Sequence, residues 1–216
     1  TPPDLKESFN GGPLVTPDGA SADALAFCYQ PTLWPELAGF RAAWEAYYAA
    51  MEDLAARIMQ VFAVALDLPS DHFAPVIDAP ISALRALHYP ATQGQALDNQ
   101  QRAGAHTDYG SLTILLPQPD RRGLQVQVGA DWVDVPTPAG AFVINIGDLM
   151  ARWTADRWVS TLHRVVAIPD QPARQSLAFF HQPNWDAEVA PLDGTDTYAP
   201  VQSGPYLMDK FRASGS

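Results

Sequence analysis

The spacing of apolar positions changes along the chain, and the first regular stretch lies between residues 40 and 68. No Pro or Gly interrupts this stretch, and alanine is frequent in it. Large apolar residues recur there at steps of three and four, which is the spacing of one face of an α-helix. The members of this stripe are Phe40, Trp44, Tyr47, Met51, Leu54, Ile58, Val61, Ala65 and Leu68. We therefore predict one long amphipathic helix that ends before Pro69 and packs on a sheet as a scaffold.

From residue 80 onwards, short apolar runs alternate with turn residues, a pattern typical of β-strands. Gly129, Ala130 and Asp131 indicate a tight hairpin, and residues 147–153 a short helical turn. No helices alternate with these strands, which argues against a doubly wound α/β sheet and favours an antiparallel sandwich or barrel. We predict a jelly roll, in a fold that is mainly β with flanking helices. The predicted strands are 84–89, 111–116, 124–128, 132–135, 141–146, 162–168 and 175–181.

Both ends of the chain lack a clear period. Residues 1–39 are rich in Pro and Gly, which predicts an irregular arm that lies on the rest of the protein. Residues 183–216 are also loop-like, with a short helix expected at 206–212. A chain of 216 residues fits one domain, and we expect residues 1–216 to form a single one with its jelly-roll core at 80–182.

Charge and cysteine content narrow the class of protein. The chain carries 13 Lys+Arg against 24 Asp+Glu, so its formal net charge is −11. Such a chain repels polyanions, so neither a nucleic-acid nor an anionic-membrane partner is expected. The single cysteine, Cys28, excludes an internal disulfide framework and a cysteine-rich zinc site, and it makes a cytoplasmic location the simplest one. The sequence has neither the pattern of a signal peptide nor an apolar run near the ~20 residues of a membrane span.

Three residues have the types and spacing of a metal site. His106 and Asp108 lie two residues apart beside a predicted strand, so in extended chain their side chains point the same way. His163 begins another predicted strand. Two imidazoles and one carboxylate on one face of an octahedron are the ligand set of non-haem Fe(II) oxygenases. Zinc hydrolases use the same residue types around a tetrahedral ion, so the three residues alone do not decide between the metals.

Arg174 and Ser176 narrow the choice between an iron oxygenase and a zinc hydrolase. They lie on the next predicted strand, eleven residues and more after His163, and share one face of it. A guanidinium fork beside a hydroxyl suits the far carboxylate of a small dianion. An iron with three open positions accommodates a bidentate 2-oxo acid together with O2. The five residues in this order therefore favour an iron site that uses a 2-oxo acid.

The chain resembles the isopenicillin-N-synthase-like branch of the Fe(II)/2-oxoglutarate-dependent dioxygenases over nearly its whole length. The family's motifs occur in the family's order, and the His-x-Asp, His and Arg-x-Ser elements together are specific to it. The matching stretches are 4–10 (DLKESFN), 84–90 (LRALHYP), 104–116 (GAHTDYGSLTILL), 123–126 (GLQV), 145–148 (NIGD), 160–166 (STLHRVV), 174–176 (RQS) and 179–184 (FFHQPN).

This resemblance implies a double-stranded β-helix, the cupin-like form of the jelly roll, with iron at its open end. It implies that His106, Asp108 and His163 are both iron ligands and catalytic residues. Arg174, Ser176 and Tyr89 would bind 2-oxoglutarate. Tyr109, Leu124 and Phe180 flank the motifs and are expected to line a substrate pocket. The implied reaction couples decarboxylation of 2-oxoglutarate by O2 to hydroxylation, desaturation or ring closure of a small molecule.

The sequence departs from the family in two places that bear on the site and the fold. The family's usual N-terminal region has no counterpart here, which indicates a fragment or a shortened chain with apolar surface exposed on the 40–68 helix. Leu87 stands where many relatives have a polar residue, so contacts to the oxo acid are expected to differ there.

Other functions fit parts of the pattern. One is an Fe(II) oxidase of the same fold that takes its electrons from the substrate and uses no oxo acid. A zinc hydrolase is a second, although the chain has no His-Glu-x-x-His helix to supply a general base. The third is a non-catalytic jelly-roll module that binds a small acid or a partner protein.

Overall fold

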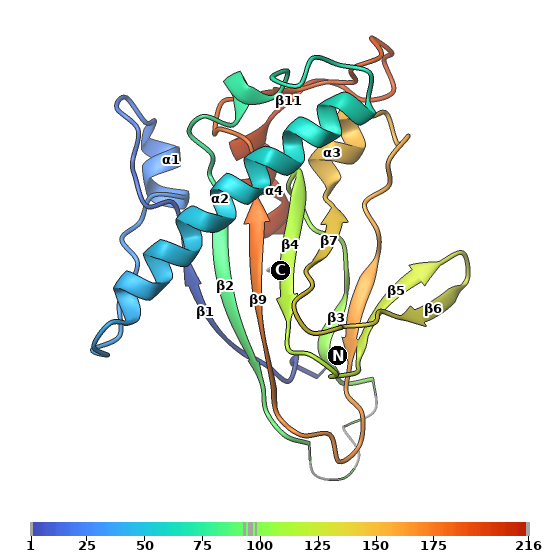
Figure 1. Ribbon diagram of the computed structural model, residues 1–216. Coiled ribbons are helices and arrows are strands. Elements are labelled where there is room, and N and C mark those ends of the chain that lie inside the picture. Colours follow the sequence, from blue (N-terminus) through green and yellow to red (C-terminus); the bar gives the residue numbers. More distant parts are fainter. Residues whose placement is uncertain (1, 93, 95–96, 98, 215–216) are drawn as a thin grey trace.

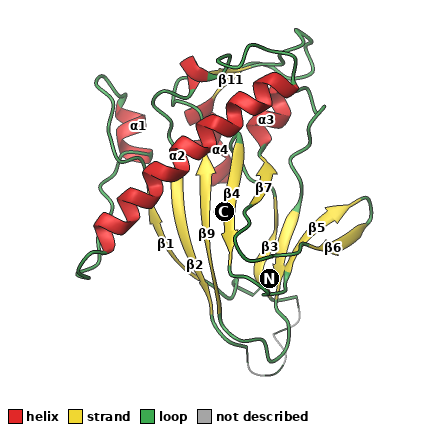
Figure 2. Cartoon of the chain, viewed as in Figure 1, coloured by secondary structure: helices red, strands yellow, loops and turns green. Residues whose placement is uncertain are grey.

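Two antiparallel sheets form the centre of the protein (Figures 1 and 2). The computed structural model describes residues 2–92, 94, 97 and 99–214. The larger sheet has five strands in the order β1-β2-β9-β4-β7, and the smaller has four in the order β3-β8-β5-β6. The prediction of a jelly-roll core is confirmed by this arrangement. The larger sheet consists of β1 (Glu7–Gly11), β2 (Ala83–Tyr89), β9 (Arg174–His181), β4 (Leu112–Pro117) and β7 (Val143–Ile146).

The smaller sheet contains one strand that the sequence analysis did not predict. Residues Gln101–His106 form β3, although Arg102, Gly104 and two alanines break the usual apolar alternation of a strand. Its pairing with β8 has two register shifts, so β3 is bulged. Gly129 and Ala130 form the two-residue turn of the predicted hairpin between β5 and β6. The remaining strands of this sheet are β8 (His163–Val166), β5 (Leu124–Val128) and β6 (Asp131–Asp134).

The segment 1–39, expected to be irregular, contributes two elements. Residues Glu7–Gly11 form β1, which pairs with β2 and extends the larger sheet by one edge strand. Helix α1 (Ala22–Phe27) begins after Ser21, whose hydroxyl accepts a hydrogen bond from the Ala24 amide. The strand was missed because an edge strand with one partner needs little apolar alternation, and only Phe9 in it packs against the main core.

Helix α2 (Phe40–Ala65) lies across the outer face of the larger sheet (Figure 1). Its buried stripe differs from the predicted one: Tyr48 is fully buried and Tyr47 only partly. Beyond Met51 the stripe continues through Ala55, Met59 and Ala63, whereas Val61 is 65% exposed. The predicted stripe averages fewer residues per step than a helical turn contains, so it drifts around the helix. Small alanines on the true inner face let the helix approach the strands closely.

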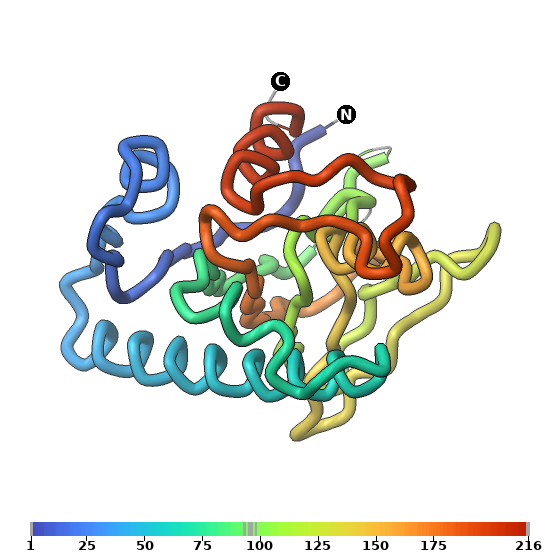
Figure 3. The backbone as a smooth tube through the Cα atoms, turned by 90° about the horizontal axis from the view of Figure 1, so that it is seen from above, coloured from blue at the N-terminus to red at the C-terminus, as the bar shows by residue number. Residues whose placement is uncertain are grey.

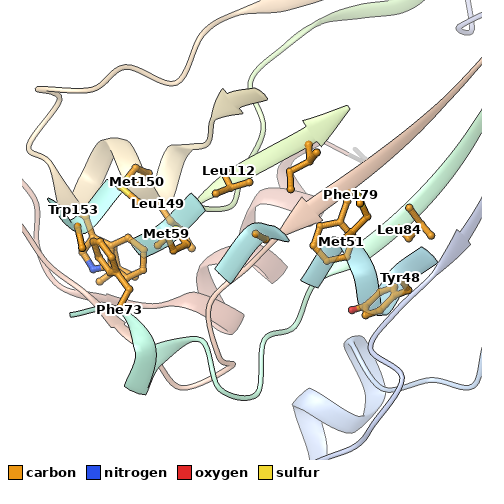
Figure 4. Packing of buried hydrophobic residues seen from close by; sticks show 14 of the residues in the cluster. Tyr48, Met51, Met59, Phe73, Leu84, Leu112, Leu149, Met150, Trp153 and Phe179 are labelled. Atoms are coloured by element: carbon orange, nitrogen blue, oxygen red, sulfur yellow. The ribbon is translucent and has the colours of Figure 1, made fainter. Parts of the chain in front are cut away.

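The main core lies between α2 and the larger sheet (Figure 4). Tyr48 packs edge-on against Phe179 of β9, and its hydroxyl donates to the Ser82 carbonyl oxygen at 2.9 Å. Met59 lies at the other end, near Phe73 and Trp153. This layer fixes the back of the larger sheet, so the sheet's other face is free to carry a site.

Helix α4 (Ser203–Ser214) lies on the opposite side of the strands from α2 (Figure 3). The predicted helical turn is confirmed as α3 (Asp148–Trp153). No helix within the described ranges has the length and apolar character needed to cross a bilayer. The remaining elements are the 3-10 helix η1 (Ala74–Val76) and the two-stranded sheet of β10 (Glu188–Val189) and β11 (Val201–Gln202).

Candidate functional site

Strand pairing brings His106 and His163 together. His106 is the last residue of β3 and His163 the first of β8, and the two residues lie directly opposite each other in the register. Asp108 lies two residues beyond the end of β3. All three side chains line one cavity between the two sheets, which we call the inner cavity. His106 and His163, 57 positions apart in the chain, thus meet at one end of the jelly roll.

The three side chains converge on one point. Asp108 Oδ1 lies 3.9 Å from the Nε2 atom of each histidine. The imidazole ring centroids are 4.3 Å apart, and the possible ligand atoms all lie within 4.8 Å of one another. Two nitrogens and one carboxylate oxygen at these separations can bind one divalent ion from one side and leave other positions open.

Backbone carbonyl groups fix the orientation of both imidazoles. His106 Nδ1 donates to the Gly104 carbonyl oxygen at 2.7 Å, and His163 Nδ1 to the Thr161 carbonyl oxygen at 3.0 Å. A carbonyl oxygen only accepts, so each Nδ1 holds the ring proton and each Nε2 keeps a lone pair for a metal. Desolvation, and then the nearby His163, lower the pKa of His106 and favour its neutral form. The donor set therefore fits a divalent transition metal.

Asp108 is held by groups on β7 and α3. Its side chain is 6% exposed, and Asn145 Nδ2 donates to its Oδ2 at 2.8 Å. The Asp148 amide donates to the Asp108 carbonyl oxygen at 2.8 Å. A side chain on Gly147 would collide with the Gly110 carbonyl, so glycine permits this close approach. Asn145 was not among the predicted site residues, although it begins the NIGD motif.

The pairing of β2 with β9 assembles a second polar group in the inner cavity. Tyr89 lies opposite Arg174 in the register, and Leu87 lies opposite Ser176. The Arg174 guanidinium carbon is 4.5 Å from the centre of the Tyr89 ring. Arg174 is 3% exposed, and its Nε and the Ser176 hydroxyl have no hydrogen-bond partner in the described part of the chain. Buried donors without partners form a receptor for a carboxylate.

Arg102 is a buried cation that the predicted site did not include. It is fully buried, and its Nη2 donates to the Pro90 carbonyl oxygen at 2.8 Å, directly after Tyr89. Its Nε and Nη1 have no partner among the described residues. Desolvation lowers its pKa, and the charge of Arg174 lowers it further. Arg102 is therefore a second buried guanidinium group near Arg174, although it does not itself line the inner cavity.

The three residues expected to form a substrate pocket lie in different places. Leu124 and Phe180 line the inner cavity, as does Leu87. Tyr109 instead contacts α4, with its ring centre 5.6 Å from that of Phe211 and 5.4 Å from the Lys210 ammonium. Leu87 presents an apolar side chain to the cavity. Lys6, from the segment before β1, lines the same cavity and forms an ion pair with Asp4.

Comparisons with known proteins show which family this chain is similar to. A family model described as the 2OG-Fe(II) oxygenase superfamily matches residues 80–183. A 2-oxoglutarate-dependent dioxygenase, tropC, of Talaromyces stipitatus is 37% identical over 208 residues, which are 92% of this chain and 62% of the relative. The Validamycin A dioxygenase of Streptomyces hygroscopicus subsp. limoneus is 36% identical over 94% of this chain and 55% of its own length. The chain thus spans less than two thirds of these two relatives.

A solved structure is similar in fold. A full-length Neurospora crassa protein, solved in complex with alpha-KG and 5-formyluracil, superimposes with a TM-score of 0.83 and 33% identity, over 98% of this chain and 70% of that one. That structure holds the oxo acid and a small molecule at the same time.

Proposed function

The chain belongs to the 2OG-Fe(II) oxygenase superfamily, and we propose that it oxidises a small organic molecule with O2 while 2-oxoglutarate is decarboxylated to succinate and CO2. One observation carries the proposal: the inner cavity holds a candidate metal-binding group and a buried carboxylate receptor together. Hydroxylation, desaturation and ring closure are all compatible with this reaction type.

His106, Asp108 and His163 would hold Fe(II) as its protein ligands and catalytic residues. Their Nε2 and Oδ1 atoms offer two neutral donors and one negative charge. The bound metal, together with the oxo acid, would supply O2 activation and removal of a hydrogen atom from the substrate. The protein's part is to orient these ligands through Gly104, Thr161 and Asn145 and to exclude water from the cavity.

Arg174, Ser176 and Tyr89 would bind 2-oxoglutarate. The Arg174 guanidinium and the Ser176 hydroxyl offer donors to the carboxylate farther from the metal. The Tyr89 ring limits the movement of the guanidinium by stacking on it. Leu124 and Phe180 would contact oxo acid or substrate in the inner cavity, and Tyr109 would contribute to the pocket through its packing on α4.

The remaining assignments concern organisation and partners. We propose that residues 1–216 form one oxygenase domain, and strand pairing between β1, near the start of the chain, and β2 supports this. The net charge of −11 supports a small-molecule substrate over nucleic acid or an anionic membrane. A cytoplasmic location is supported by the single, unpaired Cys28.

The test is an anaerobic visible-absorption titration of metal-free protein with Fe(II) and then 2-oxoglutarate. A weak charge-transfer band that needs both additions is expected, because the oxo acid must chelate the metal. Asp108→Ala should lose the band, and Asp134→Ala, on exposed β6, should keep it. Arg174→Ala should need at least tenfold more 2-oxoglutarate, because a charged hydrogen bond is lost. An unchanged band in Asp108→Ala would refute the assignment.

Turnover distinguishes the related alternatives. Succinate formed in proportion to O2 consumed is expected from the proposed reaction. O2 consumption without succinate would instead indicate an oxidase of the same fold. A protein that binds iron and the oxo acid but consumes no O2 with any substrate would be a binding module.

A further inference from the structure

A second hollow adjoins the inner cavity on the side of α4. We call it the outer groove, and its volume is about 590 Å³. Aromatic and apolar side chains from five parts of the chain form most of its wall, among them Phe27, Leu207 and Phe211. Arg85 and Phe180 line both the outer groove and the inner cavity, so they stand at the boundary between the two. A molecule in the groove therefore lies next to the cavity that holds His106, Asp108 and His163.

Arg85 is a cation at this boundary without a carboxylate partner. Its Nε donates to Asn10 Oδ1 at 2.5 Å, and its guanidinium carbon is 5.4 Å from the centre of the Phe180 ring. Within the described ranges, no acidic residue forms an ion pair with Arg85 and no group accepts a hydrogen bond from its two Nη atoms. Both Nη atoms of the guanidinium group, with their four N–H donors, are thus available to a ligand.

The surroundings of Arg85 favour an anion there. Desolvation lowers its pKa, and the Asp108 carboxylate partly opposes this shift, so the cation is both poorly solvated and near the metal side of the cavity. The formal charges of a divalent iron, Asp108, the 2-oxoglutarate dianion, Arg102 and Arg174 sum to +1, so these groups leave no negative charge for a further cation. The charge of Arg85 is then left without a counterion on this side. A carboxylate matches the guanidinium in shape as well as in charge.

We infer that the outer groove binds the substrate, and that this substrate is a small carboxylate with an aromatic or other apolar body. Its carboxylate would accept hydrogen bonds from the Nη atoms of Arg85, and its body would pack on Phe180 and Phe211. Phe27 supports Phe211, with ring centres 5.7 Å apart. The inference rests on the proposed function, because the ligand is a substrate only if the metal site beside Arg85 and Phe180 carries out the proposed reaction.

The test uses binding alone, measured calorimetrically on metal-free protein. The probes are benzoate, phenylacetate, 3-phenylpropionate and hexanoate, each compared with its amide. At least one acid is expected to bind, and to bind tenfold or more tightly than its amide, because a hydrogen bond between two charged groups is lost in the amide. Saturating 2-oxoglutarate is expected not to displace it. If no acid binds, if acid and amide bind equally, or if 2-oxoglutarate competes, the inference is wrong.

Variants locate the preference for acids. Arg85→Gln should bind acid and amide with equal affinity, and Arg85→Lys should retain part of the preference for the acid. Arg122→Gln removes an exposed arginine that pairs with Asp134, outside the groove, and should leave this preference unchanged. Phe211→Ala, on the surface of α4, should weaken acid and amide alike, and this tests the groove even if Arg85→Gln does not fold. An unchanged preference for the acid in Arg85→Gln, or unchanged binding in Phe211→Ala, would overturn the inference.

These outcomes are independent of the proposed reaction. A protein that prefers acids but shows no Fe(II) and 2-oxoglutarate band would keep the groove assignment and lose the proposed function. A protein that shows the band but has no preference for acids would do the reverse.

Discussion

At the scale of single residues, Asp108 depends on its neighbours for its position. Its carboxylate is buried, and one oxygen accepts from Asn145 while the other faces both histidines. Asn145→Leu keeps the branched shape and the number of heavy atoms of the side chain but removes this donor. We expect a 10- to 100-fold loss of Fe(II) affinity, the usual effect of losing a group that orients a metal ligand.

Anaerobic calorimetric titration with Fe(II) measures this loss. Thr113→Val is the control, because Thr113 lies opposite Asn145 in the register of β4 and β7 but donates no hydrogen bond to Asp108. Equal Fe(II) affinity in Asn145→Leu and the unaltered protein would show that Asp108 is positioned by the backbone contacts alone.

His181 makes stability depend on pH. It is buried at the end of β9 beside the Ser111 hydroxyl, 2.6 Å from its Nδ1, and burial lowers its pKa to about 4. The unfolded chain takes up the proton near the ordinary pKa of about 6.5, so the unfolded state binds more protons between these values. The contribution of the neutral ring is therefore complete above about pH 6.5 and is lost as the pH falls towards 4.

Urea unfolding at pH 7 and pH 4.5 measures this dependence. The unaltered protein should lose about 2 to 3 kcal/mol over this interval through His181 alone, from a shift of roughly two units at 1.36 kcal/mol each. His181→Gln, which does not titrate, should lose that much less. His72→Gln is the control, because His72 is exposed. The same pH dependence in His181→Gln and the unaltered protein would contradict this explanation.

A site residue can be predicted from the sequence when its partner is close to it in the chain, and it is missed when only strand pairing brings the two together. His106 and Asp108 are two positions apart in the chain, so a local spacing is enough to suggest them as a pair, although Asp108 lies beyond the end of β3. Asn145 reaches Asp108 only because β7 pairs with β4 in a particular register, which no local pattern specifies. Arg102 has no apolar neighbours at a regular spacing that would mark it as buried, so a buried charge there was not predictable.

At the scale of elements, α2 shows what periodicity does and does not determine. The absence of Pro and Gly predicts the helix, and its observed bounds agree well. The inward face is set by contact with β2, β9 and β4, where small alanines permit close packing and Met59 fills the space that remains. Both valines near the end of the helix, Val61 and Val64, face outwards instead.

Truncation of two α2 residues tests this assignment of faces. Met59→Ala should reduce the free energy of unfolding by about 2 to 5 kcal/mol, because it opens a cavity in the core. Val61→Ala, only two positions away but exposed, should change it by about 0.5 kcal/mol or less. Urea unfolding measures both. Equal losses of free energy in the two variants would mean that the helix is rotated about its axis. Unchanged Fe(II) binding by Met59→Ala would show that the loss of stability does not come from damage to the metal site.

At the scale of the whole molecule, the distribution of charge is uneven. The protein is strongly acidic, yet Arg102 and Arg174 are buried in its interior. Neither forms an ion pair with an acidic side chain among the described residues. A buried cation without a partner is costly, and the cost is reduced when a ligand brings the missing carboxylate. 2-Oxoglutarate would do so if it binds at Arg174 and Ser176, so stability should depend on its concentration.

Thermal unfolding of the anaerobic Fe(II) protein tests this dependence. At a hundred times its Kd, 2-oxoglutarate should stabilise the fold by about 2.7 kcal/mol, which raises the Tm by roughly 5 to 10 °C for a chain of this size. The monocarboxylate 2-oxobutyrate, at the same concentration, should raise it by less, because it leaves both guanidinium groups unpaired. Arg102→Met removes the hydrogen bonds from Nη2 to the Pro90 and Pro172 carbonyl oxygens, so it should lower the Tm of the ligand-free protein, and it should also reduce the gain from 2-oxoglutarate measured within that variant. An exposed control, Arg122→Met, should retain the full gain. Equal gains from the two acids would mean that the buried arginines do not bind the second carboxylate, and the charge of the interior would then need another counterion.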